Sequence, residues 1–191
     1  MHRTITIGFG MTGSYCTFSK VIAQMEALVQ SGYRVIPILS EHTSAIDTRF
    51  GTAEEHKKQM KRITGEEILE SLPQVEPIGP KRYLDVLLIA PCTGNTIAKL
   101  ANGIADTSVT LAAKSHLRNN RPVVIAVSTN DGLGANARNI GTLLARKHIY
   151  MVPFGQDDYI EKENSLVAHF DLIPKTISSA LEGKQLQPIL V

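Results

Sequence analysis

Small hydroxyl and amide residues follow a strongly apolar run between Asp85 and Asp106. Val86 to Ala90 is continuously apolar, which is typical of a parallel strand covered on both faces. The turn from Pro91 to Thr96 comes at the carboxyl end of that strand, where open α/β sheets bind their ligands. Small side chains leave its backbone N–H groups open to a flat or anionic ligand, and Asn95 adds an amide that both donates and accepts hydrogen bonds.

A second turn, Gly8-Phe-Gly-Met-Thr-Gly13, matches the pattern G-x-G-x-x-G ahead of a helix. Glycines allow a phosphate to approach the backbone, and a helix N-terminus favours its charge. Thr12 and Ser14 add hydroxyl donors. A dinucleotide site also needs an acidic residue at the end of the second strand, but that strand ends in Ser40, with Glu41 beside it. A hydroxyl side chain is better suited to binding a phosphate than to binding a ribose diol. A tight turn without a ligand is the alternative.

A third turn runs from Ser128 to Ala135, after the apolar strand Pro122 to Val127. Asn130 and Asp131 stand where a ring or a substrate would lie, and the glycines that follow allow a second close approach of the backbone. The alternative is an Asn/Asp-Gly turn selected for its backbone angles alone. We interpret Asn95 and Asn130 as the residues that orient a substrate or cofactor.

The rest of the chain alternates between strand and helix, which predicts a three-layer, doubly wound parallel sheet. No interior linker is evident, so we expect one domain over residues 1–191. Thr64 and Glu67 have the spacing of a capping box. The expected strands are 3–9, 33–39, 86–90, 122–127 and 149–152; the expected helices include 14–31, 107–117, 135–147 and 173–181; 42–72 is expected to be helical in pieces, 73–80 a loop and 154–171 a mobile loop.

Composition excludes several classes of function. The formal net charge is only +2, which predicts no nucleic-acid binding. The basic run 57–62 follows Glu54, one helical turn before Lys58, so we interpret it as a solvated helix face of mixed charge. The two cysteines lack metal-ligand spacing, which predicts neither a metal site nor a disulfide. With no signal peptide and no membrane-spanning run, we expect a cytoplasmic protein.

The segment from Pro91 to Asp106 resembles the Pro-Ala-Ser-Ala-Asn-Thr signature of the homo-oligomeric flavin-containing cysteine decarboxylases. Gly10-Met-Thr-Gly-Ser14 is similar to the N-terminal Gly-x-Thr-Gly-Ser turn of that family. The resemblance covers roughly residues 3 to 155. It implies a flavodoxin-like or Rossmann-like α/β fold, FMN as the cofactor, and a homo-oligomer.

The same resemblance implies the residues of an FMN site. Thr12, Ser14 and Ser40 would meet the phosphate, the segment from Thr93 to Thr96 would lie near the isoalloxazine, and Ala112 would line the edge of that ring. The full set of implied cofactor-binding residues is Gly10, Thr12, Gly13, Ser14, Ser40, Thr93, Gly94, Asn95, Thr96, Ala112 and Ser128.

Departures from the family pattern point to different chemistry. The decarboxylases carry a catalytic histidine eight residues before the aspartate that opens the strand, and Pro77 stands at that position here. Their Pro-Ala-Met-Asn substrate motif appears as the segment from Val127 to Asn130, and their cysteine-bearing clamp has no counterpart. A cysteine decarboxylase is therefore not expected.

Within the wider family, the chain most resembles a branch from spore-forming bacteria. Three segments carry this resemblance: Gly8 to Phe18, Pro91 to Thr96 and Asn130 to Asn139. It implies a partner A subunit, itself similar to a Rossmann dehydrogenase, and a small dicarboxylate substrate. The pair would oxidise a dihydrodipicolinate-pathway intermediate to dipicolinate in the mother cell during sporulation. NAD(P), where it takes part, is expected on the partner subunit.

Other polar residues are weaker candidates. Arg138, Arg118 and Lys114 could bind carboxylates, and His42 could transfer a proton, although each has an ordinary surface role as its alternative. We expect Cys92 to be a small turn residue rather than a reactive thiolate. His116 and His148 are expected at the surface, and Cys16 is expected to pack in the first helix.

Three functions stay open at this point. The first is a flavoenzyme subunit of dipicolinate synthesis, with Asn95 and Asn130 at the reacting ring. The second is a non-catalytic partner of the A subunit that keeps the flavin fold. The third is a nicotinamide-dependent oxidoreductase that uses Gly8 to Gly13 as a true dinucleotide turn.

Overall fold

The computed structural model describes residues 3–191. Its strands are β1 (Thr6–Met11), β2 (Arg34–Leu39), β3 (Val86–Cys92), β4 (Val123–Thr129), β5 (Ile149–Met151), β6 (Phe154–Gly155) and β7 (Leu166–Ala168). Its helices are α1 (Phe18–Gln30), α2 (Glu41–Ala45), α3 (Ala53–Thr64), α4 (Leu72–Val75), α5 (Ile78–Lys81), α6 (Gly94–Ala101), α7 (Ser108–Leu117), α8 (Ala137–Leu144) and α9 (Ile173–Leu181), with 3-10 turns η1 (Tyr15–Thr17) and η2 (Phe170–Leu172).

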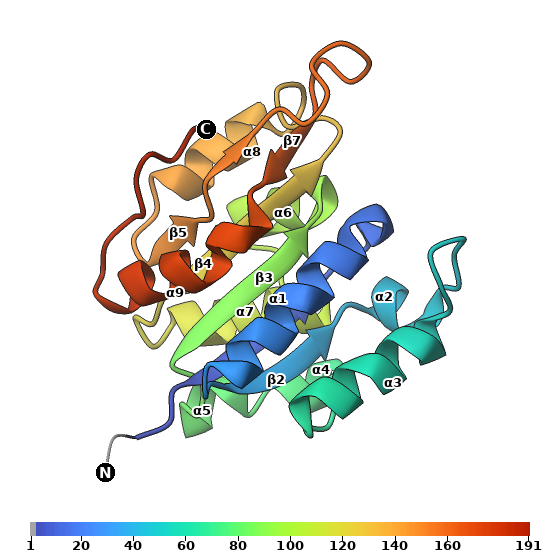
Figure 1. Ribbon diagram of the computed structural model, residues 1–191. Helices are drawn as coiled ribbons and strands as arrows, with labels where there is room; N and C mark the ends of the chain where they lie inside the picture. Colours follow the sequence, from blue (N-terminus) through green and yellow to red (C-terminus); the bar gives the residue numbers. More distant parts are fainter. Residues whose placement is uncertain (1–2) are drawn as a thin grey trace.

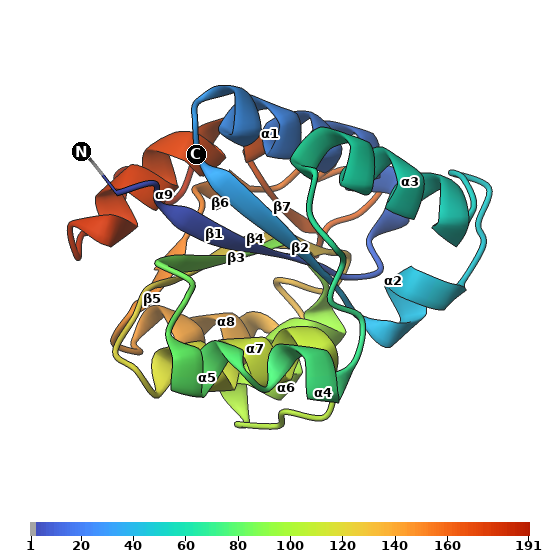
Figure 2. The same ribbon diagram turned by 90° about the horizontal axis from the view of Figure 1, so that it is seen from below.

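These elements form three layers (Figure 1). The central sheet has the strand order β2-β1-β3-β4-β7-β6, with β5 also paired to β4. Helices α1, α3 and α9 cover one face, and α4 to α8 cover the other (Figure 2). The predicted doubly wound α/β fold is therefore confirmed.

The predicted parallel sheet has an antiparallel edge. Strands β1, β2, β3, β4 and β5 are parallel to their neighbours, but β7 runs antiparallel to β4, and β6 pairs with β7. The segment 154–171, expected to be a mobile loop, supplies β6, β7 and η2. Strands of two and three residues are too short to show an alternating pattern in the sequence.

The central strands form the hydrophobic core. Every residue of β1 and β3 is buried, as expected for parallel strands covered on both faces. Helix α1 packs Val21, Ile22, Met25 and Leu28 into this core, as its apolar spacing predicts. Gly32 follows the helix with a φ of 87°, a conformation that glycine adopts without strain and that ends a helix.

Two local predictions need correction. Thr64 and Glu67 do not form a capping box, whereas Thr52 and Glu55, at the start of α3, do: Glu55 N–H donates to Thr52 Oγ1 (3.1 Å), and Thr52 N–H donates to Glu55 Oε2 (2.9 Å). Thr64 instead ends α3, because Gly65 follows it in the left-handed conformation. The expected loop 73–80 contains much of the short helices α4 and α5.

Two glycines of the G-x-G-x-x-G pattern lie inside β1, not in a turn. A Cβ at Gly8 would lie 2.6 Å from Leu84 Cδ1, and one at Gly10 would lie 3.1 Å from Val109 Cγ1. These glycines therefore allow neighbouring side chains to pack on the sheet. The turn itself is reduced to three residues, 12–14, before η1 begins.

Two further residues are placed differently from the prediction. Cys16 is exposed in η1 rather than packed in the first helix. His116, expected at the surface, is only 1% exposed on α7. Its Nε2 atom has no hydrogen-bond partner within residues 3–191. Burial, with a smaller effect of the Arg121 charge, lowers the pKa of His116 from 6.5 to about 4.

No helix in the described part of the chain is long and apolar enough to cross a membrane.

The His116 environment predicts how stability changes with pH. The unfolded chain binds a proton at this histidine below its ordinary pKa of 6.5, whereas the folded chain does so only near pH 4. As far as this histidine determines it, the free energy of unfolding therefore has its full value above pH 6.5. By pH 4 it is lower by about 3 kcal/mol, because the unfolded chain has gained a proton that the folded chain has not. Denaturant titrations of the wild type and of His116→Phe between pH 4 and pH 8 measure this loss of stability.

The variant should show a flatter pH dependence in the acid range, and a constant offset from the wild type above pH 7. Parallel curves across the whole range would contradict the buried, neutral histidine.

Candidate functional site

The carboxyl ends of β1 and β3 are joined by Thr12, which is 2% exposed. Its hydroxyl donates to the Pro91 carbonyl (2.8 Å) and accepts the N–H of Thr93 (3.0 Å). The Thr12 backbone N–H also donates to the Pro91 carbonyl (3.2 Å). The first and second turns are thereby held in contact.

The third turn is joined to the first by a pair of hydroxyls. Ser14 Oγ and Ser128 Oγ lie 2.7 Å apart, which brings the end of β4 against the start of η1. Ser128 is the sixth residue of β4 and is buried, so it lies in the strand and not in the turn. The three predicted turns therefore meet at one edge of the sheet, as expected from parallel strands.

The second turn is shorter than predicted, because α6 begins at Gly94. Thr93 caps this helix: its Oγ1 accepts the N–H of Thr96 (3.4 Å) and lies 3.1 Å from Thr96 Oγ1. Asn95 is exposed in the first helical turn, where backbone N–H groups lack partners within the helix. The Asn95 amide and these N–H groups thus lie at the same carboxyl edge of the sheet.

Asp131 organises the third turn. Its carboxylate accepts hydrogen bonds from Thr129 Oγ1 (2.5 Å) and from Asn136 Nδ2 (2.9 Å). These bonds, from Thr129 first and Asn136 second, lower the pKa of Asp131. A carboxylate held in this way positions the loop rather than accepting protons, and it leaves Asn130 exposed beside it.

Gly94 packs against this network. A Cβ at Gly94 would lie 2.5 Å from Asn136 Nδ2 and 2.6 Å from Thr129 Oγ1. Only a glycine allows the first turn of α6 to approach so closely, so the second and third turns depend on its lack of a side chain.

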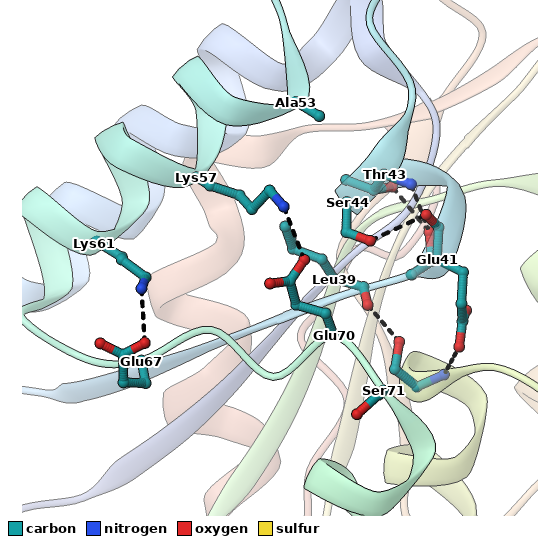
Figure 3. A network of polar contacts seen from close by, with 12 residues as sticks. Leu39, Glu41, Thr43, Ser44, Ala53, Lys57, Lys61, Glu67, Glu70 and Ser71 are labelled. Atoms are coloured by element: carbon teal, nitrogen blue, oxygen red, sulfur yellow. Dashed lines mark hydrogen bonds and ion pairs between the residues drawn. The ribbon is translucent and has the colours of Figure 1, made fainter.

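Ser40 begins α2 at the end of β2. Its Oγ accepts the Thr43 N–H (3.4 Å) and lies 2.9 Å from Thr43 Oγ1. The neighbouring Glu41 carboxylate accepts the backbone N–H of Ser108 (3.0 Å), while the Ser108 hydroxyl donates to the Leu39 carbonyl. Figure 3 shows Leu39 and Glu41 in this network, which fixes the Ser40 turn against α7.

Ion pairs fix α3 in the same region. Lys57 Nζ lies 3.1 Å from Glu70 Oε2, and Lys61 Nζ lies 2.7 Å from Glu67 Oε2 (Figure 3). Lys58 lies 3.9 Å from Glu54 on the exposed face. The basic run is therefore the mixed-charge helix face that the sequence predicts.

Two cavities open at the carboxyl edge, and they share Gly13, Tyr15 and Thr93. The smaller is about 300 Å³ and is rich in hydroxyls. The larger is about 650 Å³ and carries charged and apolar side chains. The smaller is lined by Thr12, Ser40, His42, Ile46, Asn95, Thr96, Lys99 and Thr107; the larger by Ser14, Cys16, Thr17, Lys20, Arg49, Phe50, Gly94, Ser128, Thr129, Asn130, Asp157, Lys162 and Val167.

Most of the predicted site residues thus lie at one place, with two exceptions. Gly10 is buried inside β1. Ala112 has no exposed surface and belongs to the core on α7, so it lines neither cavity. The predicted ring-edge position of Ala112 has no ligand-accessible space in this structure.

The candidate carboxylate ligands lie elsewhere. Arg118, Arg138 and Lys114 line neither cavity. Sequence reasoning instead missed Lys20, Arg49 and Lys162, which do. These three come from distant parts of the chain and have no common motif, so no local pattern could have identified them.

Cys92 and His42 are two further candidates from the sequence. Cys92 is fully buried, and burial raises the pKa of its thiol, so the protonated small-residue interpretation fits. His42 lines the smaller cavity and is exposed, while its backbone carbonyl accepts the Tyr15 hydroxyl (3.1 Å). Within residues 3–191, no cluster of three potential metal ligands occurs.

A model of the Flavoprotein family matches residues 1–164. The chain belongs to the Flavoprotein family. It is 50% identical to the B subunit of dipicolinate synthase from Bacillus subtilis over 185 residues, which is 97% of this chain and 92% of that protein. The crystal structure of the corresponding B subunit from Bacillus halodurans matches it with a TM-score of 0.91 and 48% identity, over 98% of this chain and 96% of that one.

A more distant structure shares the fold alone. DmrB of Burkholderia xenovorans, solved in complex with FMN and described as a cubic protein cage for redox transfer, has a TM-score of 0.69 and 17% identity over 95% of this chain and 98% of that one. The flavodoxin-like fold and the resemblance to the spore-former branch, both predicted from the sequence, are confirmed.

The packing of Gly94 predicts a large effect of a single methyl group. Gly94→Ala should lower the free energy of unfolding by about 1–3 kcal/mol, because the new Cβ must displace the Asn136 and Thr129 side chains. Denaturant unfolding followed by circular dichroism measures the change.

Gly134→Ala is the matched control in the neighbouring turn. Its nearest contact would be the Asp131 carbonyl at 3.5 Å, an ordinary van der Waals distance. Its effect should stay within about 0.5 kcal/mol. Equal effects of the two substitutions would contradict the close packing of α6 on the Asp131 network.

Proposed function

We propose that this chain is the FMN-binding B subunit of a dipicolinate synthase. It acts with a dehydrogenase-like A subunit to oxidise a dihydrodipicolinate-pathway intermediate to dipicolinate. Aromatisation of the ring removes two electrons and two protons, as a hydride and a proton. The observation that most strongly supports this proposal is the 50% identity to the B subunit of a dipicolinate synthase over 97% of the chain.

The carboxyl edge fits FMN in its chemistry. The two cavities meet at a shared ridge formed by Gly13, Tyr15 and Thr93. Hydroxyls of Thr12, Ser14 and Ser40 line the cavities beside this ridge, and the first N–H groups of α6 open on the same edge. Phe50 and Val167, in the larger cavity, add apolar surface for the flat ring of the substrate. The cavity volumes, about 300 and 650 Å³, lie within the range of small-ligand sites.

Bound there, FMN would supply a hydride acceptor, and the protein would supply position and electrostatics. In this proposal Thr12, Ser14 and Ser40 hold the phosphate. Asn95 and Asn130, on opposite sides of the ridge, orient the ring and the substrate as hydrogen-bond donors and acceptors. Both amides are exposed and therefore accessible.

Cysteine decarboxylation is not proposed. Pro77, at the position of the family histidine, lies between α4 and α5 and lines neither cavity. Proline has no side-chain group that transfers protons. We instead propose an oxidoreductase subunit in the cytoplasm of the mother cell. It would assemble as a homo-oligomer with its A subunit, and NAD(P) would bind on that partner.

A second candidate is a non-catalytic partner of the A subunit. The internal pairing of the proposed phosphate ligands favours it: Ser14 pairs with Ser128, and Ser40 pairs with Thr43. Hydroxyls already satisfied by the protein have less to gain from a phosphate. The nicotinamide alternative is disfavoured, because Gly8 and Gly10 lie inside β1 instead of forming a dinucleotide turn.

FMN retention separates these functions. Equilibrium dialysis with an absorbance spectrum should show about one FMN per chain and no retention of NADH or NADPH. Replacing Ser14 and Ser40 together by alanine should weaken FMN binding by about tenfold or more, because two phosphate hydrogen bonds are lost.

Ser178→Ala, on the exposed face of α9, is the control and should leave FMN binding unchanged. If the wild type retains no FMN at tens of micromolar, the non-catalytic partner becomes the better account.

Asn95 should matter for turnover. Asn95→Ala, assayed as dipicolinate formation with the A subunit present, should lower activity by about tenfold or more, because an orienting hydrogen bond is lost. Asn102→Ala, at the other end of α6, should keep the wild-type rate. Full activity of the Asn95 variant would exclude Asn95 from the reacting site.

A further inference from the structure

Three cationic side chains surround the larger cavity. Lys20 comes from α1, Arg49 from the loop between α2 and α3, and Lys162 from the loop between β6 and β7. Both loops extend beyond the end of the sheet at which α1 begins (Figure 1). Residues separated by more than a hundred positions in the sequence therefore bring like charges to one space.

Most of this charge is not neutralised within the protein. Asp157 is the acidic residue of the lining, and its Oδ2 lies 3.8 Å from Lys162 Nζ. Among the ion pairs within residues 3–191, none involves Lys20 or Arg49. Three cations and one carboxylate leave two net positive charges, the charge that complements a dianion.

The shape of Arg49 suits a carboxylate. Its guanidinium lies over the Phe50 ring, 4.9 Å from the centroid. A guanidinium stacked on an aromatic ring keeps its in-plane N–H donors available for a bidentate carboxylate bond. Phe50 and Val167 add an apolar wall to the same cavity, and Asn130 adds an amide.

The smaller cavity differs in charge. Its lysine, Lys99, is paired with Asp106, with Nζ 2.8 Å from Oδ1. Besides His42 and Asn95, the other polar side chains of its lining are hydroxyls, among them Thr12 and Ser40. Two adjoining spaces thus offer different environments, one rich in hydroxyls and one with uncompensated positive charge.

We propose that the larger cavity is the binding site for a small planar dicarboxylate. Arg49 and Lys162 hold its two carboxylates from opposing loops, Lys20 adds charge between them, and Asn130 contacts the ring. The substrate class rests on the proposed function, whereas the cation arrangement is independent of FMN. The smaller cavity and the shared ridge are left to the phosphate and ring of the flavin.

The test is calorimetric binding of pyridine-2,6-dicarboxylate to the full chain, with and without FMN. The wild type should bind this probe at least about tenfold more tightly than pyridine-2-carboxylate, which lacks the second charge. Arg49→Gln combined with Lys162→Gln should weaken binding of the dicarboxylate by about tenfold or more and abolish the preference for two carboxylates. Both side chains are exposed, and circular dichroism checks that the variant folds.

Lys175→Gln, on the exposed face of α9, is the matched control and should bind both probes as the wild type does. Unchanged dicarboxylate binding in the double variant overturns the inference, as does a wild type that binds no dicarboxylate in either condition. So does a double variant that loses FMN but keeps the dicarboxylate, because the cations would then serve the phosphate.

Dicarboxylate binding that needs Arg49 and Lys162 in a chain that retains no FMN has a different meaning. It supports the dicarboxylate site while the flavin role in the proposed function fails.

Discussion

The buried hydroxyl of Thr12 holds together the two central strands on which the carboxyl edge depends. It donates to the Pro91 carbonyl and accepts the Thr93 N–H at the point where β1 and β3 separate. Without it, the Thr93 N–H at the start of α6 would lose its partner, which costs more than the bond itself contributes, while the Pro91 carbonyl would keep only the Thr12 backbone N–H. The position of α6, and with it Asn95, depends on this side chain together with the close packing at Gly94.

The two ends of the sheet use different chemistry. At the amino end, Asp85 accepts hydrogen bonds from the Thr6 N–H and from Arg3, both at 2.9 Å, and lies 3.5 Å from Arg121. At the carboxyl end, neutral hydroxyls replace ion pairs between the strands. Hydroxyls can exchange a protein partner for a ligand at little electrostatic cost, whereas an ion pair broken by a ligand leaves a charge without its partner. This division suits a rigid amino end and a ligand-binding carboxyl end.

The ridge formed by Gly13, Tyr15 and Thr93 divides the carboxyl edge into two chemical environments. On one side the lining comes from the ends of β2 and β3, whose caps are serine and threonine. On the other side, two of the three cations, Arg49 and Lys162, come from loops, and Lys20 comes from α1. Because loops tolerate substitution better than buried strand ends, a family that shares the hydroxyl edge can change its substrate through the loops.

The sequence by itself determined the strands and the main turns of this protein. The continuous apolar runs at 86–90 and 122–127 identified buried parallel strands, and 173–181 was predicted as a helix with the observed bounds, because these signals are local. Small polar residues directly after strands also located Thr12, Asn95 and Asn130 at one edge, since parallel strands end together.

Only the tertiary structure decided what surrounds those residues. Gly8 and Gly10 belong to packing inside β1 because Leu84 and Val109 approach them, which no spacing in the sequence reveals. His116 is buried because α7 turns that face to the core. Lys20, Arg49 and Lys162 meet because the order of strands brings α1 and two distant loops to one cavity. A local pattern records the conformation of a segment, but convergence of side chains depends on how segments far apart in the chain pack together.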